Sequence, residues 1–166
     1  MPLRLRPLRA SDEDEFIRSR LAMENFGLYY EEGMEFARYL DVLRGATAGV
    51  GLPRGHVAST LLVADVGGAI VGGLSLRHRL NPILRAVGGH IGYQVVATHR
   101  LRGYGTEMLR QALPIARDLG LDRVLVTCDE DNIGSRKIIE RCGGIYEDSY
   151  GADLAVPKRR YWIALK

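Results

Sequence analysis

Cysteine is scarce in this chain: only Cys128 and Cys142 occur among 166 residues, with no nearby His or Cys at metal-ligand spacing. A disulfide scaffold and a bound metal are therefore not expected, and both thiols are interpreted as small buried hydrophobes. No uninterrupted apolar run approaches the roughly 20 residues that span a bilayer. The first residues alternate Leu and Arg instead of forming an apolar leader. These absences predict a cytoplasmic protein with no membrane partner.

Charge of one sign is equally scarce, because 23 Lys and Arg residues face 20 Asp and Glu residues, for a net charge of +3. The basic residues are scattered and no aromatic residues interleave with them, so no nucleic-acid partner is expected. What is present is an ordinary globular composition, 46% hydrophobic and 26% charged. The length suits one domain with a sizeable core, and we assign residues 1–166 to it.

Hydrophobic periodicity predicts antiparallel strands first and alternating strands and helices later. Predicted strands cover 3–8, 60–66, 69–76, 89–96, 124–128 and 160–165, with Gly67-Gly68 as a hairpin turn. One helix is predicted after Ser11, a second over 34–44, a third ending at Gly120 and a fourth over 133–142. Residues 45–55 are predicted to form a loop. This order indicates a single α/β domain in which a strand-helix-strand crossover supplies one parallel pair.

Two local details carry their own expectations. The acidic run 12–15 is interpreted as the solvated first turn of the first helix, where negative charge favours the helix dipole. Pro114 falls inside the third predicted helix, where a kink or a bulge is expected.

The segment from Val95 to Thr106 is the most informative part of the chain. A strand ends, a basic loop with Arg100 and Arg102 follows, and a helix begins at Gly103 and Gly105. The first N–H groups of a helix lack partners and the helix dipole favours negative charge there, so this pattern predicts an anion site. Glycines let a bulky diphosphate approach the backbone closely.

Two other phosphate-binding motifs are disfavoured. A Rossmann fingerprint would need a third glycine where Met108 stands, and a P-loop would end in Gly-Lys-Ser or Gly-Lys-Thr, which is absent.

The segment Arg100–Gly105 resembles the coenzyme A loop of the GNAT acetyltransferases, Arg/Gln-x-x-Gly-x-Gly/Ala. A second family element follows at the expected distance in Asn132–Lys137, and the resemblance extends over roughly 88–148. It implies a single-domain GNAT-like α/β fold: a mixed, mostly antiparallel sheet with a central splayed parallel pair and helices on both faces. It also implies acetyl-CoA as the co-substrate.

The resemblance assigns cofactor roles residue by residue. The backbone from Tyr93 to Val95 would pair with the pantetheine arm, and a bulge at Tyr93 and Gln94 would splay the strand and expose an oxyanion-stabilising N–H. The N–H groups of 101–106 would hold the pyrophosphate. The implied cofactor-binding residues are Tyr93, Gln94, Val95, Arg100, Leu101, Arg102, Gly103, Tyr104, Gly105, Thr106, Asn132 and Ser135.

The catalytic residues are less well defined. Many family members carry a tyrosine seven residues after the matching asparagine, as proton donor to the departing thiolate, but Ile139 stands there. Ser135, Cys142 and Tyr146 are the candidate substitutes. A lysine-like amine has a pKa of ~10.4, so a general base is needed. Candidate bases are Glu24, Glu31 and His90, although His90 also fits a half-buried strand histidine bonded to backbone, and Tyr29 and Tyr30 are candidate walls of the acceptor pocket.

The predicted function is direct transfer of an acetyl group from acetyl-CoA to a primary amine in a ternary complex, since no Ser-His-Asp or Cys-His motif indicates an acyl-enzyme. Because Ile139 lacks a proton to donate, a coenzyme A-binding sensor without turnover is the alternative. A third interpretation is an unrelated α/β phosphate-binding protein. Small amines, antibiotics, amino acids, protein N-termini and lysines all remain open as acceptors, whether small molecule or peptide. Exposed strand edges are compatible with a homodimer.

Overall fold

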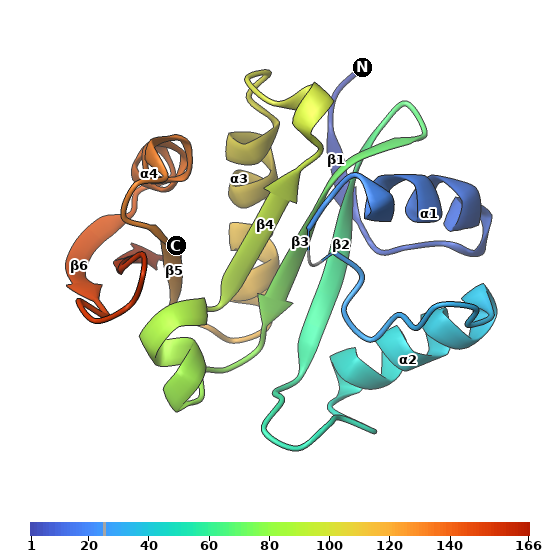
Figure 1. Ribbon diagram of the computed structural model, residues 1–166, viewed down its shortest axis with the longest axis horizontal. Helices are drawn as coiled ribbons and strands as arrows, with labels where there is room; N and C mark the ends of the chain where they lie inside the picture. The colour runs from blue at the N-terminus through green and yellow to red at the C-terminus, as the bar shows by residue number, and fades with distance from the viewer. Residues whose placement is uncertain (25) are drawn as a thin grey trace.

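The computed structural model describes residues 1–24 and 26–166, which form a seven-stranded sheet in the order β1-β2-β3-β4-β5-β7-β6 (Figure 1). The strands are β1 (Arg4–Arg6), β2 (Ser59–Val66), β3 (Ala69–Arg77), β4 (Ile91–Val95), β5 (Arg123–Asp129), β6 (Ile145–Tyr150) and β7 (Lys158–Ala164). The α-helices are α1 (Glu13–Leu21), α2 (Phe36–Ala48), α3 (Tyr104–Asp118) and α4 (Ile133–Arg141). None of these helices is long and apolar enough to cross a membrane.

The centre of the sheet is where the strand direction changes. All neighbouring strands pair antiparallel except β4 and β5, which are parallel and in register only at Ile91 and Val126. Beyond that pair the two strands separate. The predicted α/β fold, with a mostly antiparallel sheet and a splayed parallel pair, is confirmed.

The splay occurs without the predicted bulge. β4 pairs with β3 in unbroken register from Leu76 opposite Ile91 to Gly72 opposite Val95. The expectation of a bulge at Tyr93 and Gln94 was therefore wrong. Where the two strands separate from each other, β5 keeps its pairing with β7 and β4 keeps its pairing with β3.

Helices cover both faces of the sheet, as predicted, and two adjacent glycines of β3 show which side chains pack on each face. A Cβ at Gly72 would lie 3.0 Å from the sulfur of Met108 in α3, whereas a Cβ at Gly73 would lie 2.0 Å from the ring of Phe26. Successive residues of a strand point to opposite faces. Accordingly, α3 and α4 lie together on one side of β4, and α1 and α2 lie together on the other side of the sheet (Figure 1).

Each face has its own hydrophobic core. Leu74, Met108 and Ile139 belong to the larger core, beneath α3 and α4. The smaller core, beneath α1 and α2, centres on Phe16, which is fully buried and contacts the ring of Tyr39 at a centroid distance of 5.2 Å.

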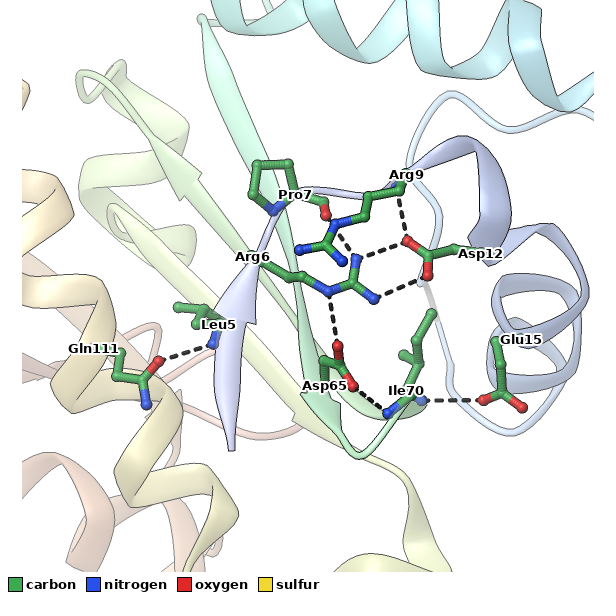
Figure 2. Close-up of polar contacts among 10 residues, drawn as sticks. Leu5, Arg6, Pro7, Arg9, Asp12, Glu15, Asp65, Ile70 and Gln111 are labelled. Carbon is green, nitrogen blue, oxygen red and sulfur yellow. Dashed lines mark hydrogen bonds and ion pairs between the residues drawn. The ribbon is translucent and has the colours of Figure 1, made fainter. Parts of the chain in front are cut away.

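The acidic run after β1 is not simply a solvated helix turn. Asp12 is buried and accepts two hydrogen bonds from Arg6, at 2.7 and 2.9 Å, while Arg6 Nε donates to Asp65 at 2.9 Å (Figure 2). Glu15 accepts from the backbone N–H of Ile70 at 3.0 Å. The interpretation was wrong for Asp12, because its partner is a buried arginine on the first strand.

Element boundaries differ from the sequence predictions in a few places. The predicted loop 45–55 was wrong in its first residues, since α2 continues to Ala48 and ends at Gly49, whose φ is +75°. Strand β6 was missed, because it is an exposed edge strand without alternating burial. Helix α3 runs on through Pro114. The Gly67-Gly68 turn is confirmed, with φ of +62° and +92°, as a two-residue hairpin requires.

Candidate active site

A cavity of about 950 Å³ lies at the ends of β4 and β5, against the first turns of α3 and α4. It gathers most of the site residues expected from the sequence. Those that line it are Glu24, Tyr93, Gln94, Val95, Arg100, Leu101, Gly103, Tyr104, Gly105, Thr106, Asn132 and Ser135. Arg102 and His90 do not line it.

The start of α3 presents free backbone donors to this cavity. Glu107 is the residue whose N–H donates to the carbonyl of Gly103, closing the first turn. Within the described residues, the N–H groups of Tyr104, Gly105 and Thr106 have no backbone partner and no side chain caps them. Such a helix start favours an anion, as the sequence pattern predicts.

The two glycines of the loop serve different purposes. Gly103 has a φ of +81°, which favours glycine, and a Cβ there would have nothing within 4 Å. Gly105 instead permits close helix packing, since a Cβ there would come within 2.7 Å of Cδ1 of Ile138 in α4. The sequence interpretation gave both the same role; the geometry gives Gly105 a packing role as well.

Positive charge reaches the cavity from two elements. Arg100 comes from the loop, and its Nε donates to the carbonyl of Val95 at 3.3 Å. Lys137 and Arg141 come from α4 and were not predicted as site residues. Their spacing of four residues, which places side chains on one helix face, was the available signal. Arg102 is exposed and donates to the carbonyl of Thr98 at 3.5 Å.

The edge of β4 offers unpaired backbone groups to the gap. Val96 N–H donates to Val71 and Arg77 N–H donates to His90, so the hydrogen-bonded positions facing β3 are the even-numbered residues of β4. The backbone groups of Tyr93 and Val95 therefore face β5, which has already diverged. The donation from Arg100 to the Val95 carbonyl fits this direction.

Two hydroxyl groups meet across the gap. Tyr93 Oη lies 2.9 Å from Ser135 Oγ, joining β4 to the first turn of α4. Burial raises the pKa of Tyr93 to about 12, so the phenol stays protonated near neutral pH. Ile139, at the family's tyrosine position, is fully buried, and Ser135 lies one turn before it on the same helix face.

The other candidate proton donors lie elsewhere. Cys142 donates weakly to the carbonyl of Thr106 at 3.7 Å, and burial raises its pKa. Tyr146 is 45% exposed and bonds to Ser149 at 2.8 Å. Neither lines a cavity at the splay.

A second cavity, of about 230 Å³, adjoins the first. Residues that line both cavities are Tyr93, Asp129, Asn132 and Ser135. Asn132 also caps α4, since its side-chain oxygen accepts from Ser135 N–H at 3.0 Å. The smaller cavity is further lined by Arg77 and Lys158, which sequence reasoning missed because nothing local marks them.

His90 lies away from both cavities. Its Nδ1 accepts a hydrogen bond from the backbone N–H of Leu125 at 2.9 Å, and the ring packs near Trp162. Burial, with the charges of Arg77 and Arg123, lowers the pKa of His90 to about 4. This geometry matches the alternative interpretation of His90 as a strand histidine bonded to backbone.

The remaining acceptor-side candidates divide. Glu24 lines the large cavity, whereas Glu31 lines neither. Tyr30 packs against Phe16 in the smaller core, and the hydroxyl of Tyr29 bonds to His56 Nδ1 at 2.7 Å. Neither tyrosine lines a cavity at the splay.

Comparison with solved structures supports the fold. Mycobacterium smegmatis RimJ in complex with CoA-disulfide is 23% identical, with a TM-score of 0.69 over 98% of this chain and 81% of that one. The Salmonella typhimurium yncA protein with acetyl-CoA is 13% identical, with a TM-score of 0.64 over 99% and 94%. A RimL ribosomal L7/L12 alpha-N-protein acetyltransferase in complex with CoA is 17% identical, with a TM-score of 0.68 over 98% and 94%.

Sequence comparison gives the family. A search of curated protein sequences finds no match. The family model for the acetyltransferase (GNAT) domain matches residues 2–145, which covers most of the chain and both motif segments. The chain therefore belongs to the GNAT acetyltransferase family.

Proposed function

We propose that this protein transfers an acetyl group from acetyl-CoA to a primary amine by direct attack within a ternary complex. The observation that carries the proposal is the free helix start of α3 beside the unpaired edge of β4, within one cavity. The helix start suits phosphates, and the unpaired strand edge suits a chain that contains amide groups. Coenzyme A has both, in its pyrophosphate and its pantetheine arm.

In this proposal the N–H groups of Tyr104, Gly105 and Thr106 bind the pyrophosphate, with Lys137 and Arg141 adding positive charge. The pantetheine arm lies along β4 and pairs with the backbone of Tyr93 and Val95, displacing Arg100 from the Val95 carbonyl. This places the thioester near the wall shared by the two cavities.

The acceptor enters from the smaller cavity. Its amine nitrogen attacks the thioester carbon, the C–S bond breaks, and an amide and the free thiol of coenzyme A result. One proton passes in net from the amine to the sulfur. Because a lysine-like amine is mostly protonated at neutral pH, a base must accept its proton, and Glu24, which lines the large cavity, is our candidate.

The leaving thiolate needs the proton that Ile139 cannot give. Ser135, supported by Tyr93, is our candidate donor, since their hydroxyl groups are bonded to each other and line both cavities. A thiol with a pKa of ~8.5 is an acceptable leaving group, so a weak proton donor suffices.

The test is calorimetric titration of acetyl-CoA and free coenzyme A into wild type, Gly103→Glu and Gly103→Gln. The two variants share size and backbone strain, and only one adds negative charge at the helix start. We expect Gly103→Glu to weaken binding by ~100-fold or more and Gly103→Gln by much less. Absence of binding to folded wild type would refute the proposal.

A coenzyme A-binding sensor without turnover is the second candidate, and the burial of Ile139 is the observation that favours it. Release of coenzyme A thiol in the presence of amines separates the two. Binding without thiol release from any amine would favour the sensor.

A further inference from the structure

The guanidinium group of Arg77 lines the smaller cavity and forms no salt bridge with any residue that the structure describes. Arg77 Nη1 donates to the carbonyls of Gly88 and Gly89 at 3.2 and 3.4 Å. Across residues 1–24 and 26–166, Nε and Nη2 of Arg77 have no hydrogen-bond partner and no carboxylate pairs with the group. Burial lowers the pKa of Arg77, as expected for a cation short of a counter-charge.

Arg77 gives this cavity a net positive charge. The ionised groups that line it are Arg77, Lys158 and Asp129. Lys158 and Asp129 are bonded to each other, so their charges offset. One positive charge is left, which matches a ligand group with a single negative charge, such as a carboxylate, better than a doubly charged phosphate.

The position of Arg77 also fits an acceptor. By strand alternation, Arg77 shares a face of β3 with Gly73, which is the face covered by Phe26 and opposite to α3. A Cβ at Gly92 would lie only 3.3 Å from Arg77 Nη1, so the guanidinium packs directly on the backbone of β4. The amino end of a ligand in this cavity would then reach the shared wall at Tyr93 and Asp129.

We infer that the smaller cavity binds the acceptor, and that the acceptor is a small amine carrying a carboxylate a few bonds from its amino group, of the α- or β-amino-acid class. Arg77 holds the carboxylate, and the wall at Asp129 receives the amino group. The inference rests on the proposed function. A volume of about 230 Å³ suits such a molecule, since sites for drug-sized ligands measure about 300–1,000 Å³. The product is the N-acetyl amino acid, which keeps its carboxylate.

The experiment compares paired acceptors: the common L-amino acids and β-alanine against their carboxamides, which keep the amine and lose the negative charge. Thiol release from acetyl-CoA is measured with wild type, Arg77→Gln and Arg77→Lys. Arg79→Gln is the matched control, because Arg79 is exposed and lines neither cavity. Calorimetry with acetyl-CoA on every variant shows whether the cofactor site is intact.

We expect wild type and Arg79→Gln to favour at least one acid over its amide by about 10- to 100-fold in kcat/KM. Arg77→Gln should bring that ratio near one while acetyl-CoA affinity is unchanged, and Arg77→Lys should restore part of it. Equal use of acids and amides, a preference that survives Arg77→Gln, or turnover of neither panel by a protein that binds acetyl-CoA would overturn the inference. Failure of the wild-type protein to bind acetyl-CoA would instead refute the proposed function.

Discussion

Two arginines of the sheet, Arg6 on β1 and Arg77 on β3, are both withdrawn from solvent but differ in whether a carboxylate neutralises their charge. Arg6 is 7% exposed and is held by Asp12 and Asp65, which raise its pKa (Figure 2). Arg77 donates to two backbone carbonyl oxygens and pairs with no carboxylate in the part of the chain that the structure describes, and burial lowers its pKa. A cation that is compensated within the protein stabilises the fold, whereas an uncompensated one beside a cavity is available to a ligand.

The Arg6 network joins segments that are distant in sequence. It connects β1 to the start of α1 through Asp12 and to the β2–β3 hairpin through Asp65. Nearby, Gln111 of α3 accepts from the backbone N–H of Leu5 at 2.8 Å (Figure 2). These polar groups are hydrogen-bonded within the protein, so few donors or acceptors remain here for a ligand.

The largest effect that would sharpen the comparison is expected from Arg6→Met. Removing one partner of a buried ion pair leaves Asp12 uncompensated, which typically costs about 3–5 kcal/mol of unfolding free energy. The measurement is equilibrium denaturation with urea. Arg110→Met is the control, because the Arg110–Glu107 pair is exposed and such pairs contribute roughly 0–1 kcal/mol. Equal losses in the two variants would contradict a structural role for Arg6.

His90 is a third buried group, and its Nδ1 can accept the hydrogen bond from Leu125 N–H only while the ring is neutral. Its folded pKa of about 4 is below the ordinary value of 6.5, so the folded state binds the proton less tightly than the unfolded state. Its contribution is therefore complete above pH 6.5 and is lost as the pH falls toward 4, by about 3 kcal/mol in all. The lowered pKa values of Asp12 and Asp65 act in a more acidic range, below the ordinary carboxyl values.

His90→Asn tests this directly, because the asparagine oxygen can still accept the hydrogen bond from Leu125 N–H but does not titrate. Urea denaturation of both proteins between pH 7 and pH 4 is the measurement. We expect the variant to lose much less stability over this range. Parallel pH dependence in the two proteins would contradict the assignment.

Sequence reasoning succeeded where the signal is local. The hairpin at Gly67-Gly68 and the glycines before α3 are recognisable because turn geometry and helix starts depend on adjacent residues. It failed where the deciding fact is how side chains pack together in the folded chain. Asp12 looked like a solvated helix turn, but its carboxylate is buried against Arg6, whose guanidinium is also held by Asp65 on β2.

Arg77, Asp129 and Lys158 escaped notice for the same reason, because a cavity between separating strands leaves no spacing pattern in the sequence. Edge strand β6 was missed because its exposed residues do not alternate. Ile139, by contrast, is a departure from the family pattern that the sequence alone reveals. Because its side chain has no acidic proton, our proposal assigns proton donation to Ser135, one turn earlier on the same helix.

The smallest effect is expected from Arg77→Met, and it separates the two arginines most directly. The substitution removes two long hydrogen bonds to Gly88 and Gly89, but it also removes a half-buried charge that no carboxylate of the described residues neutralises. These contributions oppose each other, so the unfolding free energy in urea without ligands should change by no more than about 1 kcal/mol. A loss as large as that of Arg6→Met would make Arg77 a brace of the turn before β4. A small change would show that folding does not depend on Arg77, as its proposed role toward a ligand requires.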